Sequence, residues 1–187
     1  MNAPLNQIAE FSKRLEAMPI DLEQVEFFCT IVTELAQMIE ETVGMKQAEG
    51  FITSVGLRMG KVIADKYTGK AVNHVGRLEA LAAVLIDLKR RIKGEFYVIE
   101  IADTHILLGN KRCPFGEAVK GRKSLCMMTT NVFGRIAADA GGYARVAVLD
   151  SIASGSDECR ILVDLSLENE PAYHDIKPLH SGEFFAT

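Results

Sequence analysis

Three stretches in the N-terminal half repeat apolar residues at steps of three and four. Between residues 21 and 43, Asp21 suits a helix N-cap and Gly44 follows the last apolar position. The apolar positions of this stretch are Leu22, Val25, Phe28, Val32, Leu35, Ile39 and Val43. The same spacing recurs over residues 49–67 and 75–92. The pattern predicts three amphipathic helices with their apolar faces towards the core.

Two features of the second and third helices have a structural explanation. Gly56 and Gly60 lie four residues apart, which predicts a close crossing with another element rather than a phosphate-binding loop. The third helix ends in Lys89, Arg90 and Arg91. Cations at the C-terminus of a helix favour its dipole, so we interpret this cluster as capping rather than as a binding patch.

Beyond Gly94 the pattern changes to short apolar runs. Residues 96–101 and 104–108 are typical of a hairpin, a helix is expected over 124–140, and strands are expected at 143–149 and 160–167. This order predicts an α+β fold, with N-terminal helices packed on an antiparallel sheet of about four strands and one further helix between two hairpins.

The predicted elements form one domain over residues 21–167, between an N-terminal segment, 1–20, and a C-terminal tail, 168–187. The tail ends in a pair of aromatic residues, Phe184 and Phe185, that suits an arm docking on a neighbouring subunit.

Composition narrows the class of protein. The 187 residues carry a formal charge of −4, with 48% hydrophobic and 25% charged residues, as in an ordinary globular protein. The chain has no block rich in Lys and Arg, so we expect no direct nucleic-acid binding. It also has no apolar stretch of membrane-spanning length and no secretory signal, so we expect a cytoplasmic protein with no membrane partner.

Three cysteines fall at the ends of predicted elements. Cys113 follows the first hairpin, Cys126 begins the next helix and Cys159 precedes the last strand. Soft sulfur ligands from separate elements are typical of zinc, or alternatively of an iron–sulfur cluster. The fourth ligand stays open, and the candidates are Glu117, Glu158, His105, a water or an effector. Cys29 lies in a helical apolar stripe and is expected to be inert.

Two alternatives remain beside the metal centre. The cysteines can be separately buried residues of a scaffold or interaction module. Alternatively, Cys126 at a helix N-terminus can be the nucleophile of a thiol-dependent enzyme, with a histidine as base. No family-specific nucleophile signature surrounds Cys126, so we expect a protein that is not an enzyme.

The segment CPFGEAVKGRKSLCMMTTNVFGRIAADAGGYARVAVLDSIASGSDECRILVDL resembles the carboxy-terminal half of the methanogen output domain family, a set of small regulatory domains. The motifs are CPFG, LCMMT followed by NVFG, GYA and the closing C-I-V, and the resemblance covers about residues 21–167. The chain is also similar to 4-vinyl-reductase-like sensor domains, in which cysteines of this region bind zinc beside a small-molecule pocket, and to iron–sulfur regulators with a CPY/CPF motif.

These resemblances imply a cytoplasmic sensory domain whose metal is bound by Cys113, Cys126 and Cys159. They also imply a small apolar effector between helices and sheet, and signalling through a partner protein. We expect the domain to be a homodimer.

Overall fold

A computed structural model describes residues 3–20, 23–67, 78–167 and 177–186. Its helices are α1 (Ala3–Glu16), α2 (Gln24–Val43), α3 (Met45–Tyr67), α4 (Leu78–Arg91) and α5 (Cys126–Gly141). Its strands are β1 (Phe96–Ile101), β2 (His105–Asn110), β3 (Tyr143–Asp150), β4 (Cys159–Asp164) and β5 (His180–Phe185). The predicted succession of helices and hairpins is confirmed, although the expected N-cap Asp21 and the start of the third helix lie outside the described residues.

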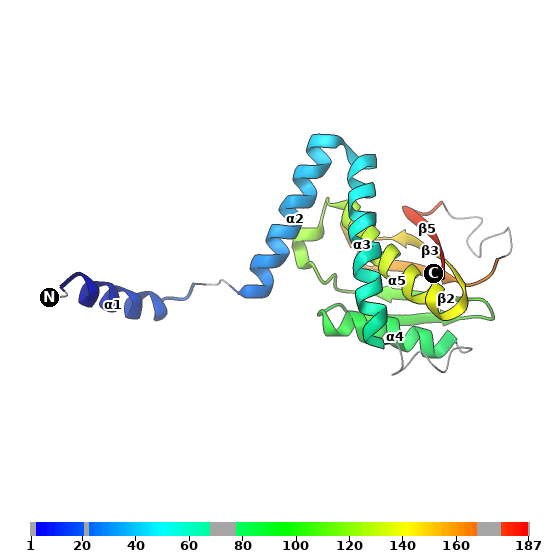
Figure 1. The fold of residues 1–187 in the computed structure, drawn as a ribbon, viewed down its shortest axis with the longest axis horizontal. Coiled ribbons are helices and arrows are strands. Elements are labelled where there is room, and N and C mark those ends of the chain that lie inside the picture. Colours follow the sequence, from blue (N-terminus) through cyan, green and yellow to red (C-terminus); the bar gives the residue numbers. More distant parts are fainter. Residues whose placement is uncertain (1–2, 21–22, 68–77, 168–176, 187) are drawn as a thin grey trace.

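The strands form one antiparallel sheet in the order β1-β2-β4-β3-β5. Helices α4 and α5 pack on one face of this sheet, and α3 packs on α5 (Figure 1). Alternation along the strands turns Ile106, Val146 and Val163 towards these helices, where all three are fully buried. The α+β class is therefore confirmed.

The sheet has five strands where about four were predicted. The additional strand, β5, comes from the segment expected to be a tail, and it pairs with β3 at the sheet edge. The sequence HSGEFF shows no apolar alternation, and Phe184 is the one residue of this strand that is buried. The Phe184 ring packs over Gly134 of α5, where an added Cβ would lie 2.1 Å from a ring carbon. Phe184 therefore docks on its own chain.

The close helix crossing predicted from Gly56 and Gly60 is confirmed. A Cβ on Gly56 would lie 2.8 Å from the Asn131 Cβ, and one on Gly60 would lie 2.9 Å from the Arg135 Cβ. Both glycines are buried where α3 crosses α5. Small residues at this spacing let the two backbones approach each other, and this fixes α3 over the sheet.

The apolar face of α2 does not point to the core as predicted. The helix turns Thr33 and Ala36 inward, whereas Phe28, Leu35 and Met38 are 54%, 57% and 58% exposed. Periodicity reveals that a helix has an apolar face, but not what that face contacts. The outward face of α2 is therefore exposed in the described part of the chain.

Candidate effector-binding site

A cavity of about 450 Å³ lies at one end of the sheet, between the sheet and helices α2 to α5. The sheet register explains its position, because Phe96, Asn110 and Cys159 are partners across β1, β2 and β4. The connection from residue 111 to residue 125 and the end of β3 complete the wall. Most of the lining is apolar, including Ile63 and Val132 from α3 and α5.

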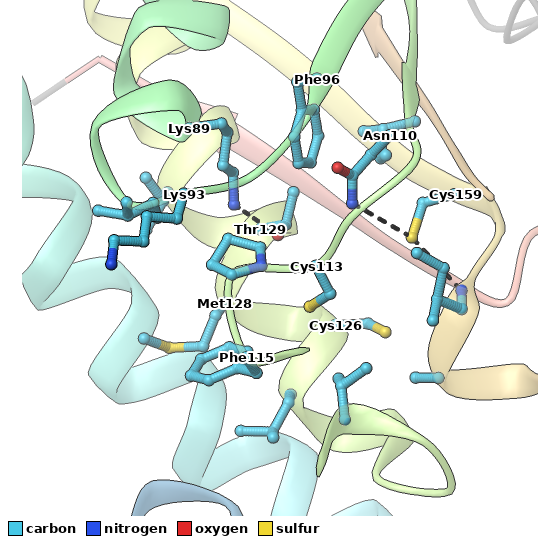
Figure 2. A pocket seen from close by; sticks show the side chains of 18 of the residues that line it. Lys89, Lys93, Phe96, Asn110, Cys113, Phe115, Cys126, Met128, Thr129 and Cys159 are labelled. Atoms are coloured by element: carbon cyan, nitrogen blue, oxygen red, sulfur yellow. Dashed lines mark hydrogen bonds between the residues drawn. The ribbon is translucent and has the colours of Figure 1, made fainter. Parts of the chain in front are cut away.

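The three cysteines predicted to converge all line this cavity (Figure 2). Cys113 comes from the loop after β2, Cys126 from the first residue of α5 and Cys159 from the start of β4. Cys29 of α2, which was expected to be inert, also lines the cavity. Its thiol donates a weak hydrogen bond to the Pro114 carbonyl at 3.8 Å. The ends of three elements and the interior of α2 thus bring all four thiols of the chain to one chamber.

The environment of two of these thiols, Cys113 and Cys126, favours their protonated form. Burial raises the pKa of Cys113, and it raises the pKa of Cys126 to about 11. The Cys159 sulfur accepts hydrogen bonds from the Asn110 side-chain amide at 3.7 Å and from the Ile152 backbone N–H at 3.4 Å. Nucleophilic attack needs thiolate, so Cys113 and Cys126 are poorly prepared for that role.

The candidates for a fourth metal ligand lie elsewhere. Glu158 accepts a hydrogen bond from the Tyr97 hydroxyl at 2.7 Å, Glu117 pairs with Lys120, and His105 lies at the opposite end of β2. Over the described ranges, no group of three or more His, Cys, Asp or Glu side chains is arranged to hold a metal ion. The residues in this arrangement do not fit zinc or an iron–sulfur cluster, and the metal centre stays a prediction of the sequence.

Lys89 has a different position from the one predicted. It is only 6% exposed and lines the cavity, while Arg90 and Arg91, which also lie in the last turn of α4, pair with Asp87. The sequence signal for this orientation was present, because position 89 lies four residues after Leu85 and therefore on the inward face of α4. The interpretation of Lys89 as a capping residue was wrong.

Polar and aromatic neighbours surround the Lys89 ammonium group (Figure 2). Its Nζ donates a hydrogen bond to Thr129 Oγ1 at 2.8 Å and lies 5.0 Å from the ring centroids of both Phe96 and Phe133. Burial lowers the pKa of Lys89 to about 8, so the amine still carries a charge at pH 7. The cavity is therefore apolar with one buried cation.

Fold and cavity together describe a small α+β domain with an apolar cavity at one end of its sheet. The family model for methanogen output domain 1 matches residues 31–164, and the chain belongs to this family of regulatory domains. A comparison with curated protein sequences finds no match.

Two solved structures share the fold at low sequence identity. One is the phenol-responsive sensory domain of the transcription activator PoxR with phenol, with a TM-score of 0.55, 16% identity, and coverage of 78% of this chain and 76% of that chain. The other is trafficking protein particle complex subunit 3 from Naegleria fowleri, covalently bound to palmitic acid, with a TM-score of 0.55, 14% identity, and coverage of 76% and 95%.

None of the helices within the described ranges is both long enough and apolar enough to cross a membrane.

Proposed function

We propose that this regulatory domain is a sensor that holds a small apolar effector in the cavity and signals through α2 to a partner chain. The apolar cavity carries this proposal, because its 450 Å³ lies within the range of about 300–1,000 Å³ typical of small-molecule sites. The two structures with this fold are a complex with phenol and a protein covalently bound to palmitic acid, and both ligands are largely apolar molecules. The role proposed for the domain is regulatory and includes no catalytic step.

The connection between β2 and α5 provides a physical link from the cavity to α2. On one side it lines the chamber with Cys113, Pro114, Phe115, Val119 and Leu125. On its other side, Arg122 donates hydrogen bonds to the Thr33 carbonyl and to the Glu34 carboxylate, both at 3.2 Å. An effector that shifts this connection therefore changes the position of α2. Effector binding then shifts the population from the arrangement of α2 in the empty domain to its arrangement in the bound domain.

The exposed face of α2 supports a homodimer. Phe28, Ile31, Leu35 and Met38 follow one another at steps of three and four, which is the spacing of an apolar two-helix interface. Single exposed apolar residues are common, but a row of large ones along a helix marks an interaction surface. A second copy of α2 carries the same spacing, so the surface is self-complementary.

The homodimer is tested by sedimentation velocity on Leu35→Glu, which places a charge in the centre of this row. We expect the variant to sediment as a monomer at concentrations where the wild type is a dimer, because an unpaired buried charge opposes association. Thr30→Glu, at an exposed polar position of the same helix, is the control. A monomeric wild type, or a dimer that persists in Leu35→Glu, would refute this arrangement.

The effector site is tested by filling the cavity. Ala153 is 4% exposed and lines the chamber, so Ala153→Phe places a ring in the ligand space. Calorimetric titration with apolar acids, alcohols and phenols should show binding to the wild type that is lost in this variant. Ala186→Phe, at an exposed position, should bind like the wild type. If the folded wild type binds none of these compounds, the chamber is a feature of a scaffold and the proposal fails.

A further inference from the structure

The charged residues of the cavity wall all have the same sign. Lys89, Arg91 and Lys93 line the chamber, and none of the described lining residues is Asp, Glu or His. Arg91 already pairs with Asp87, and Lys93 is exposed at the surface. Lys89 is therefore the cation that a ligand meets inside the chamber.

We propose that the effector is an apolar carboxylic acid whose carboxylate pairs with the Lys89 ammonium while its hydrocarbon part fills the chamber. This inference rests on the proposed function and names the chemical class of the ligand.

The bonding of Lys89 leaves room for an anion. An ammonium group has three N–H donors, and one of them reaches Thr129 Oγ1. Within the described part of the chain, no carboxylate pairs with this ammonium. The faces of Phe96 and Phe133 partly stabilise the charge but accept no strong hydrogen bond. Buried cations are normally paired, so an anionic ligand supplies the missing partner.

Neighbouring groups favour a carboxylate over a neutral or cationic head group. The sulfurs of Cys113, Cys126 and Cys159 share the chamber with Lys89, and burial keeps the first two protonated at pH 7. Cys113 and Cys126 therefore add no negative charge that would compete with the ligand. A neutral alcohol or phenol leaves the cation uncompensated, and an amine is repelled by it.

The apolar part of the ligand has its own surroundings. Ile63 and Val132 line the chamber from α3 and α5, and Val148 and Ile161 line it from the sheet. This wall has little specificity beyond size and apolar character, whereas the ammonium group distinguishes the head group. Aliphatic and aromatic acids both satisfy this description, and the binding experiment separates them.

The experiment measures calorimetric affinities for matched pairs of probes, decanoate with decanol and 4-phenylbutyrate with 4-phenylbutanol. The wild type should bind at least one acid ten or more times more tightly than its alcohol. In Lys89→Met, which keeps the length and apolar stem of the side chain, this preference should disappear while the alcohol still binds. Lys61→Met removes an exposed cation of α3 that does not line the cavity and should keep the preference.

The outcomes separate this inference from the proposed function. If acids and alcohols bind the wild type equally, or if Lys89→Met keeps the preference for acids, the role of Lys89 is refuted while the effector site stands. If neither kind of probe binds the wild type, both proposals fail. A folding defect in Lys89→Met is detected by circular dichroism, and Lys89→Gln then replaces it, with the same loss of preference expected.

Discussion

The crossing of α3 and α5 yields a prediction whose sign depends on position along one helix. At Gly60, an alanine Cβ would lie 2.9 Å from the Arg135 Cβ and 3.3 Å from the Val132 Cα, whereas ordinary van der Waals contact begins at 3.4 Å. The helices must therefore move apart or distort. The same substitution at Gly50 of α3 meets nothing within 4 Å. The two positions share one helix and differ in what surrounds them.

The magnitudes follow from two opposing effects. Overpacking a close contact costs about 1–3 kcal/mol. Replacing a helical glycine by alanine gains roughly 0.5–1 kcal/mol from helix propensity and the smaller entropy loss. We therefore expect Gly60→Ala to lower the free energy of unfolding by about 1–2 kcal/mol, taking overpacking as larger than the propensity gain. Gly50→Ala should raise it by about 0.5–1 kcal/mol.

Urea unfolding followed by circular dichroism measures both values. For a domain of this size each kcal/mol corresponds to a shift of roughly 2–4 °C in melting temperature, which provides a second measurement. Gly56→Ala should resemble Gly60→Ala, because its Cβ would lie 2.8 Å from the Asn131 Cβ. If all three substitutions stabilise the protein equally, α3 does not cross α5 at these glycines, and the α3 wall of the cavity is misplaced.

Three further predictions concern the sheet edge and the thiols. Phe184→Ala should destabilise the domain by about 3–5 kcal/mol in urea unfolding, because it removes a buried ring; a loss below about 1 kcal/mol would mean that β5 does not dock on α5. Because burial raises the pKa of Cys126 to about 11, its thiolate fraction at pH 8 is roughly 100 times smaller than that of an ordinary cysteine. Iodoacetamide should therefore label Cys126 slowly in the native protein, at a rate that rises with pH up to that value, and fast labelling at pH 7 would contradict the buried position. Elemental analysis after anaerobic purification without a tag should find a molar ratio of metal ions to chains far below one. Stoichiometric zinc or iron that is lost in Cys113→Ser, Cys126→Ser and Cys159→Ser but kept in Cys29→Ser would instead establish the metal centre predicted from the sequence.

The local sequence pattern predicted helices α2 to α5 and strands β1 to β4 correctly, and it predicted one contact between two helices. Apolar periodicity marked α2 to α5, the two hairpins were recognised from paired short runs, and the glycine pair indicated the α3–α5 crossing. The convergence of Cys113, Cys126 and Cys159 followed from their positions at element ends. Each of these inferences depends on residues close together in the chain, where backbone geometry limits the possible arrangements.

The errors arose where a property depends on contacts between distant segments. β5 escaped detection because one buried ring, Phe184, provides its main contact with α5. The apolar row of α2 looked like a core face, but the residues that would cover it are not on the described part of this chain. Periodicity contains no information about which surface a helix meets.

The sequence by itself determined the class of the fold, the membership of a regulatory family and the gathering of the cysteines at one end of the sheet. Only the tertiary structure decided what that end contains: an apolar chamber, partly buried thiols and the ammonium group of Lys89. The physical reason is desolvation, since the charge and reactivity of a cysteine or lysine depend on the groups that replace water around it. Segments far apart in the chain supply those groups, so they are known only once the chain is folded.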